Sequence, residues 1–281
     1  MRLTLRQALD QGTQLFEQSA IGVPRLTAEV LLCHALHRDK SFLYAHGDEE
    51  LSELAWIHYG RYLHERLQGK PTQYITKVQE WYGRPFRVTP DVLIPRPETE
   101  HVIEVALART PPGQRGRTVD IGCGSGAIGV TWQLETGAPT WLSDISTAAL
   151  GVAVANAGSL NAAIQGAVAC DLCEAFGPAA FDIVLSNPPY IPDPEREHLQ
   201  REVRDFEPAV ALFGGPTGVE IYARLLAGAE RVLRPGGWIA MEIGYRAQAS
   251  VLALLSPRWR AAQTAQDLAG WPRVVSAQYW P

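Results

Sequence analysis

The chain has 281 residues, enough for one large α/β domain together with a small one. Hydrophobic residues make up 46% and charged residues 20%, a balance typical of a folded globular protein and not of a disordered one. The formal net charge is -5 and no run of Lys and Arg stands out, which weakens a duplex-DNA function. No apolar stretch approaches the roughly 20 residues that span a bilayer, and the first residues lack a signal-peptide core. We therefore expect a cytoplasmic protein that binds neither membrane nor nucleic acid directly.

The cysteines and histidines do not predict a metal site. Cys170 and Cys173 form a lone Cys-x-x-Cys pair, whereas a structural zinc site needs four ligands and the sequence has no second pair. His34 and His37 are three residues apart, but no third ligand follows at a matching spacing. Reduced, partly buried thiols are the expected state of the cysteines.

Residues 1–71 predict a small helical domain. Apolar residues recur at helical spacing from Leu5 to Phe16, again over residues 24–36, and again over residues 51–67. Pro24 suits the first turn of the second helix. None of these segments contains a glycine-rich loop or a catalytic cluster.

Residues 72–97 predict a short β-hairpin linker, because Trp81, Tyr82, Phe86 and Val88 lie around Gly83 and Pro85. Two prolines, at positions 95 and 97, then fix an extended segment that leads into a helix. That helix is expected to run to about Arg109, with Thr99 or Glu98 placed to start it.

Residues 98–281 predict an α/β domain with a mostly parallel, doubly wound sheet, because strands and helices alternate from residue 118 onward. The strand patterns cover residues 118–121, 140–144, 164–169, 181–186, 238–243, 264–268 and 274–279. The helical patterns between them cover residues 127–136, 146–160 and 218–231. The Arg-Pro-Gly-Gly sequence at 234–237 predicts a turn before the fifth strand. The expected fold is a seven-stranded, Rossmann-like sheet.

A glycine-rich loop between the first strand and the next helix predicts a cofactor site. A strand, a glycine turn and a helix N-terminus let a ligand approach the backbone closely, with free N–H groups nearby. The candidate residues are Asp120, Gly122, Cys123, Gly124, Ser125 and Gly126. Residues 124–129 also match the Gly-x-Gly-x-x-Gly dinucleotide fingerprint, and Asp144 lies near the spacing of its ribose acid. An NAD-dependent oxidoreductase is therefore an alternative.

Three acidic residues favour S-adenosylmethionine as the cofactor. Asp120 ends the first strand, where its carboxylate can serve the methionine amino group directly or indirectly and would repel a pyrophosphate. Asp144 ends the second strand and is placed to accept hydrogen bonds from both ribose hydroxyls. Asp171 follows the third strand and can accept from the adenine amino group, with Leu172 packing on the ring.

The sequence Asn187-Pro188-Pro189-Tyr190 follows a buried strand, at the edge of an open α/β sheet where ligands bind. The Asn187 side-chain oxygen and the Pro188 carbonyl are two acceptors that suit the two N–H groups of a primary amide or amine. Pro189 offers no N–H, and Tyr190 can cover a planar substrate. Holding both N–H groups orients a poorly nucleophilic nitrogen, so we predict catalysis by positioning and electrostatics. Asn187 also borders the predicted cofactor site.

These motifs resemble the release-factor glutamine N5-methyltransferases over nearly the full chain. The matching segments are residues 71–75, 93–100, 120–126, 144–146, 187–190, 207–208, 211–215, 242–244, 267–270 and 273–275. Asn-Pro-Pro-Tyr is shared with adenine-amino DNA methyltransferases, whereas Pro-Arg-Pro-Glu-Thr-Glu separates this family from the ribosomal-protein glutamine methyltransferases. The chain departs from the family at Cys123, where Thr is usual, and at Pro216-Thr217, where the family usually has an acidic residue.

The resemblance implies a substrate and a division of labour. The substrate would be the glutamine of the Gly-Gly-Gln motif in class 1 peptide chain release factors, whose methylation modulates translation termination. Residues 1–71 would bind that substrate, and residues 98–281 would form the S-adenosylmethionine-dependent methyltransferase domain. An adenine-amino DNA methyltransferase is the alternative, but it would need a basic, base-reading region that the first 70 residues do not suggest.

Overall fold

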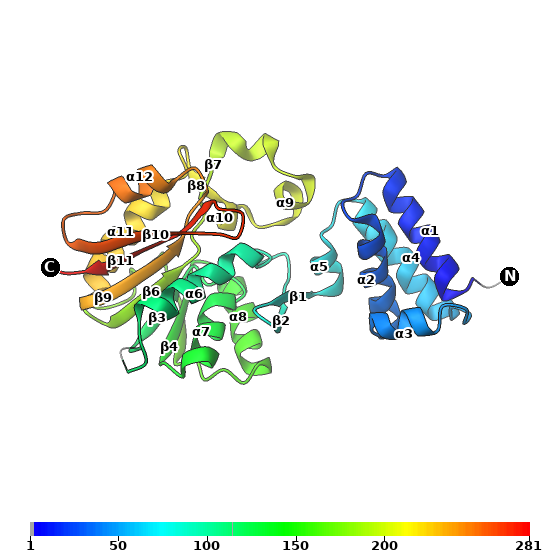
Figure 1. Cartoon of the computed structure of the whole chain (residues 1–281), viewed down its shortest axis with the longest axis horizontal. Coiled ribbons are helices and arrows are strands. Elements are labelled where there is room, and N and C mark those ends of the chain that lie inside the picture. Colours follow the sequence, from blue (N-terminus) through cyan, green and yellow to red (C-terminus); the bar gives the residue numbers. More distant parts are fainter. Residues whose placement is uncertain (1–2, 114) are drawn as a thin grey trace. The chain divides into compact units, whose positions relative to one another are not determined.

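The computed structural model describes residues 3–113 and 115–281 (Figure 1). Two compact units divide the chain. The first consists of Met1–Lys77 with Gln200–Phe206, and the second of Val78–Leu199 with Glu207–Pro281. Within the described ranges, every helix is too short or too polar to cross a bilayer.

The first unit is helical and has its own apolar core, formed by side chains that include Leu9, Phe16, Leu31 and Leu32. Its helices are α1 (Leu5–Gln18), α2 (Pro24–Leu36), α3 (Lys40–Ala45), α4 (Glu53–Leu67), α5 (Thr72–Thr76) and α9 (Arg201–Phe206). The three predicted helices are confirmed, although α4 begins at Glu53 and not at residue 51. The short helices α3, α5 and α9 escaped prediction because five or six residues hold too little of an apolar repeat.

Helix α9 joins the first unit through a pair of residues far apart in the chain. The Arg66 Nη2 donates to Glu202 Oε2 at 2.5 Å, and the Arg66 side chain is only 9% exposed. A buried guanidinium is stabilised by a charged partner, and this pair links residues 200–206 to the helical unit.

The second unit is built on a seven-stranded sheet with the order β10-β11-β9-β6-β3-β4-β5. Its strands are β3 (Thr118–Ile121), β4 (Thr140–Asp144), β5 (Gly166–Ala169), β6 (Phe181–Ser186), β9 (Leu233–Glu242), β10 (Trp259–Gln266) and β11 (Pro272–Tyr279). Pairs within β5-β4-β3-β6-β9 are parallel, whereas β11 runs antiparallel to both β9 and β10. The predicted mostly parallel, seven-stranded sheet is confirmed.

Helices cover both faces of this sheet (Figure 1). They are α6 (Glu100–Arg109), α7 (Ala127–Thr136) and α8 (Thr147–Ser159) on one face, and α11 (Glu220–Val232) and α12 (Gln248–Ala253) on the other. Alternate residues of β6 serve the two cores: Ile183 and Leu185 pack with the first group, and Val184 with the second. A strand buried on both faces reads as a continuous apolar run, as residues 183–185 of β6 do.

Several predicted element ends are wrong for local reasons. Strand β5 begins at Gly166, two residues after its predicted start. Strand β9 begins at Leu233 and not at residue 238, so the predicted turn at 234–237 lies inside this strand, where its pairing with β6 is irregular. Strand β10 ends before Leu268, which is 99% exposed at the tip of the β10–β11 hairpin. Helix α11 begins after Gly218, whose φ of 79° is not helical. In α8, the terminal residue Ser146 is instead the cap and accepts from the Ala149 backbone N–H.

The predicted hairpin is formed by β1 (Val78–Trp81) and β2 (Arg84–Arg87), which pair antiparallel in the second unit. Its two-residue turn, Tyr82-Gly83, has φ values of 50° and 68°, as a type I′ turn requires. Asn156 of α8 accepts from the Arg87 N–H and donates to the Arg87 carbonyl and to the Ser125 carbonyl. One buried amide thus ties the hairpin to the glycine-rich loop.

Candidate active site

The glycine-rich loop after β3 has the left-handed backbone that its glycines allow. Gly122, Gly124 and Gly126 have φ values of 69°, 52° and 81°. A Cβ at Gly126 would lie 3.1 Å from the Ala153 Cβ, whereas Gly122 and Gly124 have no neighbouring atom within 4 Å of that position. The first two glycines therefore leave open space above the loop, and the third permits close packing of α7 against α8.

Asp144, at the end of β4, faces this loop and organises it. Its Oδ2 accepts from the Gly124 N–H and its Oδ1 from the Ser146 N–H, both at 2.9 Å. The side chain is half-buried and lines the pocket, so its remaining lone pairs face a ligand in that space.

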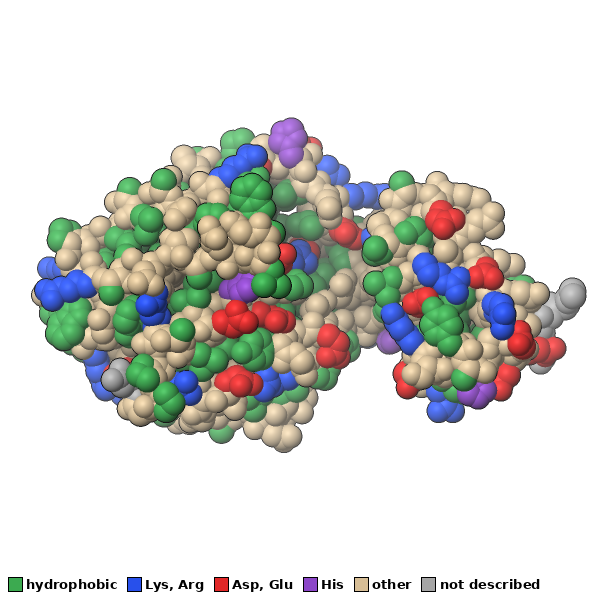
Figure 2. All heavy atoms as spheres, viewed as in Figure 1, with side chains coloured by type: hydrophobic (Ala, Val, Ile, Leu, Met, Phe, Trp, Pro, Cys, Tyr) green, Lys and Arg blue, Asp and Glu red, His purple; other side chains and the backbone are tan. Residues whose placement is uncertain are grey.

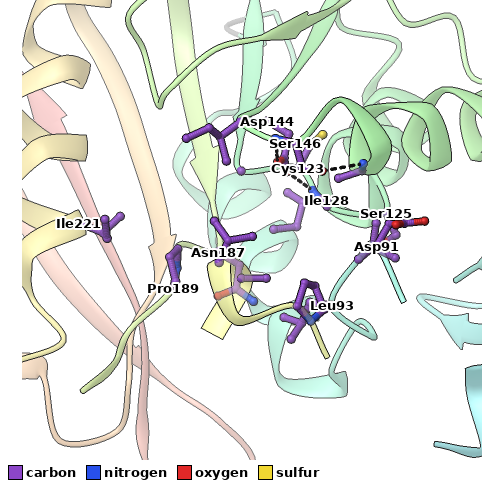
Figure 3. A pocket seen from close by; sticks show the side chains of 18 of the residues that line it. Asp91, Leu93, Cys123, Ser125, Ile128, Asp144, Ser146, Asn187, Pro189 and Ile221 are labelled. Atoms are coloured by element: carbon purple, nitrogen blue, oxygen red, sulfur yellow. Dashed lines mark hydrogen bonds between the residues drawn. The ribbon is translucent and has the colours of Figure 1, made fainter. Parts of the chain in front are cut away.

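One pocket at the carboxyl ends of β3, β4 and β6 gathers most of the predicted site residues (Figure 3). The predicted residues that line it are Gly122, Cys123, Gly124, Ser125, Asp144, Asp171, Leu172, Asn187 and Pro189. The predicted residues that do not line it are Asp120, Gly126, Pro188 and Tyr190. The loop, the acidic strand end and the Asn-Pro-Pro turn therefore share one cavity.

Asp120 lies beneath the loop and not in the pocket lining. It is fully buried, and its Oδ2 accepts from the Gly129 N–H at 2.8 Å. Among the described residues its Oδ1 has no hydrogen-bond partner. Burial raises the pKa of Asp120 to about 7, against the opposing hydrogen bond from Gly129. Of the two roles predicted for Asp120, only the indirect one is compatible with this position.

The pocket also includes residues to which the sequence analysis assigned no role in the site. Asp91, Leu93 and Pro95 come from the segment before α6, while Phe213 and Arg224 approach from β8 (Phe213–Gly215) and α11. Asp91 and Leu93 lie at the pocket in Figure 3. A loop without periodicity carries no signal for such a position; only the Leu-Ile-Pro-Arg-Pro motif pointed to this segment.

Asp171, after β5, is paired in this structure. The Arg224 Nη2 donates to Asp171 Oδ2 at 2.5 Å, and both residues line the pocket. The neighbouring Leu172 also lines the pocket, with an unusual φ of 48°. Arg224 is thus a further polar group beside the predicted adenine position.

The Asn-Pro-Pro-Tyr turn is held by glycines from a distant segment. After Tyr190 the chain forms β7 (Ile191–Pro192), which pairs with β8. A Cβ at Gly214 would lie 2.7 Å from the Pro189 carbonyl oxygen, and one at Gly218 would clash with the Tyr190 carbonyl oxygen. Larger residues at these two positions would displace the turn, which explains the glycine-rich segment after Phe213.

A hydrogen-bonded chain connects the two ends of the same turn. The Asn187 Nδ2 donates to Thr99 Oγ1 at 3.2 Å, and Thr99 Oγ1 donates to Glu242 Oε2 at 2.5 Å. The Tyr190 hydroxyl donates to Glu242 Oε1 at 3.1 Å. Of the two predicted starting residues, Thr99 and Glu98, Thr99 stands at the N-cap position of α6, but its side chain bonds Glu242 and makes no capping hydrogen bond.

Glu242 lies at the end of β9 and is 1% exposed. Burial raises the pKa of its carboxyl group, whereas the hydrogen bonds from Thr99 and Tyr190 and the charge of Arg273 lower it. Arg273 is itself paired with Asp267 at 3.0 Å. Burial has the larger effect, so the pKa lies above its ordinary value although two hydroxyl donors and a nearby guanidinium oppose the shift.

The structure also pairs two motifs that are far apart in sequence. The Arg96 Nη2 donates to Glu207 Oε1 at 2.5 Å, and the Glu207 side chain is 1% exposed. The Pro-Arg-Pro segment and the Glu-Pro segment therefore form one partly buried contact, and both segments contribute residues to the pocket.

The two departures from the family pattern have simple structural settings. The Cys123 backbone N–H donates to the Ser143 carbonyl at 2.9 Å, and burial raises the pKa of its thiol. Thr217 bonds Glu220 Oε1 through both its N–H and its hydroxyl. All four cysteines are free, as predicted.

The residues of this pocket fit S-adenosylmethionine. The cradle above Gly122 and Gly124 admits a ligand against the backbone, and beneath it the Asp120 Oδ1, which has no partner among the described residues, is an acceptor on the side of the methionine amino group. Asp144 offers acceptors for a ribose, and Leu172 offers an apolar surface for a purine. The sheet order and this pocket place the protein among the S-adenosylmethionine-dependent methyltransferases.

Similarity to known proteins shows which family of methyltransferases this chain belongs to. Residues 7–76 match the PrmC N-terminal domain family, and residues 102–203 match the Methyltransferase small domain family. A release factor glutamine methyltransferase of Koribacter versatilis is 42% identical over 275 residues, covering 97% of this chain and 98% of that protein. One of Nitratidesulfovibrio vulgaris is 39% identical over 284 residues, covering 98% and 95%. The chain belongs to the release factor glutamine methyltransferase family.

Solved structures of more distant proteins share the fold. A methyltransferase from Pyrococcus furiosus is 15% identical with a TM-score of 0.54, covering 71% of this chain and 91% of that one. The T. thermophilus 16S rRNA N2 G1207 methyltransferase in complex with AdoMet and guanosine is 20% identical with a TM-score of 0.52, covering 72% and 49%. Both likenesses confirm the α/β methyltransferase architecture.

Proposed function

We propose that this protein transfers the methyl group of S-adenosylmethionine to the side-chain amide nitrogen, N5, of the glutamine in the Gly-Gly-Gln motif of class 1 peptide chain release factors. The observation that carries the proposal is the shared pocket: Asn187 and Pro189 line the same cavity as the glycine-rich loop and Asp144. Relatives of nearly equal length and 36–42% identity bear the name release factor glutamine methyltransferase. None of these observations favours a DNA adenine methyltransferase or an NAD-dependent oxidoreductase.

The chemistry requires little of the protein beyond positioning. When bound, S-adenosylmethionine supplies an electrophilic methyl group on a sulfonium. The Asn187 side-chain oxygen and the Pro188 carbonyl accept the two amide N–H groups and so direct the nitrogen lone pair towards the pocket. They also stabilise the positive charge that develops on the nitrogen, and Tyr190 covers the planar amide. No enzyme nucleophile is needed.

The cofactor would be held by the loop and the strand ends. In this proposal Gly122, Cys123, Gly124 and Ser125 contact its methionine portion, with Asp120 acting from below through Gly126 and the start of α7. Asp144 accepts from the ribose hydroxyls, a role that its position at the pocket supports. Asp171 and Leu172 flank the adenine, together with Asn187 at the reacting end.

The helical unit is proposed to bind the release factor. It has its own core and supplies none of the pocket-lining residues. On α4, Leu54 and Ile57 are one turn apart and 65% and 59% exposed, an apolar pair suited to a protein partner. Replacing both with Ser should raise KM for the release factor and leave cofactor affinity unchanged.

We propose that the enzyme acts in the cytoplasm, where translation terminates, without binding nucleic acid or membrane directly. On the face seen in Figure 2, Lys and Arg side chains are scattered among acidic and uncharged ones. A mixed surface of this kind supports recognition of a protein more than of a phosphate backbone.

Incubation of the purified enzyme with S-adenosylmethionine and a release factor tests the proposal. Peptide mass spectrometry should find one added methyl group on the glutamine of Gly-Gly-Gln, and none when that glutamine is replaced by Glu. A parallel reaction with adenine-containing duplex DNA should show no transfer. Methylated DNA with an unmodified release factor would reject the proposed substrate.

A further inference from the structure

The orientation of Asn187 matters because the two ends of an amide have opposite hydrogen-bonding character. Its oxygen only accepts, and its NH2 group only donates. A substrate N–H group can therefore be held only if the oxygen faces the pocket. Asn187 follows β6 on a turn, so its backbone alone does not determine which end faces inward.

We propose that Thr99 and Glu242 are positioning residues that determine which end of the Asn187 amide faces the substrate. The inference rests on the proposed function, because it assigns the reason why Asn187 presents its oxygen to a glutamine amide. Three contacts carry it: Asn187 Nδ2 to Thr99 Oγ1 at 3.2 Å, Thr99 Oγ1 to Glu242 Oε2 at 2.5 Å, and the pocket-lining positions of Asn187 and Thr99.

The direction of each hydrogen bond follows from counting protons. Both Glu242 oxygens accept from hydroxyl groups, Oε2 from Thr99 and Oε1 from Tyr190, so the Thr99 hydroxyl gives its single proton to Glu242. Thr99 Oγ1 then offers only lone pairs to Asn187. The NH2 end of Asn187 satisfies them, and the amide oxygen is turned the other way.

Burial makes this arrangement selective. Thr99 is 4% exposed and Glu242 is 1% exposed, so water cannot readily replace either partner. Reversing the Asn187 amide would place two acceptors, its oxygen and Thr99 Oγ1, against each other in a dry site.

Glu242 also reaches the other end of the turn, because the Tyr190 hydroxyl donates to its second oxygen at 3.1 Å. One carboxylate on β9 therefore holds both the residue that would bind the substrate N–H and the ring that would cover the substrate plane. Tyr222 provides a matched control, since its hydroxyl donates to the Glu242 backbone carbonyl, also at 3.1 Å, outside this chain of side chains.

Kinetics of four variants test the proposal. Thr99→Val removes the hydroxyl at nearly constant volume and should lower kcat about tenfold or more, with S-adenosylmethionine affinity by calorimetry within about twofold of wild type. Thr99→Ser keeps the hydroxyl and should retain most of the wild-type kcat. Glu242→Gln should lower kcat, because its amide can donate to Thr99 and so free the Thr99 proton to face Asn187. Tyr222→Phe should leave kcat unchanged. Wild-type kcat in Thr99→Val, or no rescue by Thr99→Ser, would overturn the proposal.

A second measurement needs no release factor and so separates this inference from the proposed function. The chain has three asparagines, Asn156, Asn161 and Asn187, so [15N]asparagine labelling yields three side-chain NH2 signals, assigned with Asn187→Asp. Thr99→Val should shift the Asn187 signal and speed its exchange with water, and Tyr222→Phe should leave it in place. An unchanged Asn187 signal in Thr99→Val contradicts the positioning role even if the enzyme methylates a release factor. The converse result, a shifted signal with no methylated glutamine in the wild type, rejects the proposed substrate alone.

Discussion

Asp120 makes the stability of the second unit depend on pH in an unusual direction. Its pKa is raised from 3.8 to about 7 by burial, so the folded protein binds the proton more tightly than the unfolded chain does. The free energy of unfolding contributed by this group therefore falls as pH rises between these two values, by about 1.4 kcal/mol per pH unit. Asp120→Asn keeps an acceptor for the Gly129 N–H and cannot ionise. Relative to wild type, this variant should gain about 2 kcal/mol between pH 5 and pH 7.

Urea unfolding followed by circular dichroism at both pH values measures this difference. Asp193→Asn, at an exposed position, controls for the loss of one carboxylate and should show no comparable pH dependence. Taking the difference in unfolding free energy between the two proteins removes the contributions of the titrating groups that they share. If the stability difference between Asp120→Asn and wild type were the same at pH 5 and pH 7, the reasoning from burial would be refuted.

Three other changes probe the site and its support. Asn187→Ala should lower turnover on the order of 100-fold or more while calorimetry finds S-adenosylmethionine bound as before; unchanged turnover would exclude the clamp. Asp144→Ala removes the acceptor for two loop N–H groups and the proposed ribose contact, so affinity for the cofactor should fall at least about tenfold, and equal affinity would reject that role. Gly129→Ala would place a Cβ 2.5 Å from Leu142 Cδ2 and should cost about 1–3 kcal/mol of stability by thermal unfolding. Gly151→Ala, with open space at its Cβ, should cost nothing, and equal losses at both positions would count against the packing argument.

The functional site was predictable where short motifs stand at strand ends. Asp144 ends β4, and Asn187 begins the turn after β6. Parallel strands have their carboxyl ends at the same edge of the sheet, so the meeting of these two residues in one pocket followed from their order along the chain. Thr99 or Glu98 was predicted to start a helix, because a hydroxyl or carboxylate before a helix often caps it. Its true partner, Glu242, is 143 residues away, and no local pattern predicts that contact.

The amino-acid sequence by itself determined the longer helices, the seven strands of the main sheet and their order. Apolar periodicity distinguished helices from strands, glycines marked the loop that needs a left-handed backbone, and the motifs named the family. Only the tertiary structure decided which side chains meet across the fold: Asn156 between hairpin and loop, Arg66 with Glu202, and the glycines at 214 and 218 against the Pro-Tyr backbone. Periodicity and propensity act over a few residues, whereas these contacts depend on the packing of segments that the sequence separates by tens of positions or more.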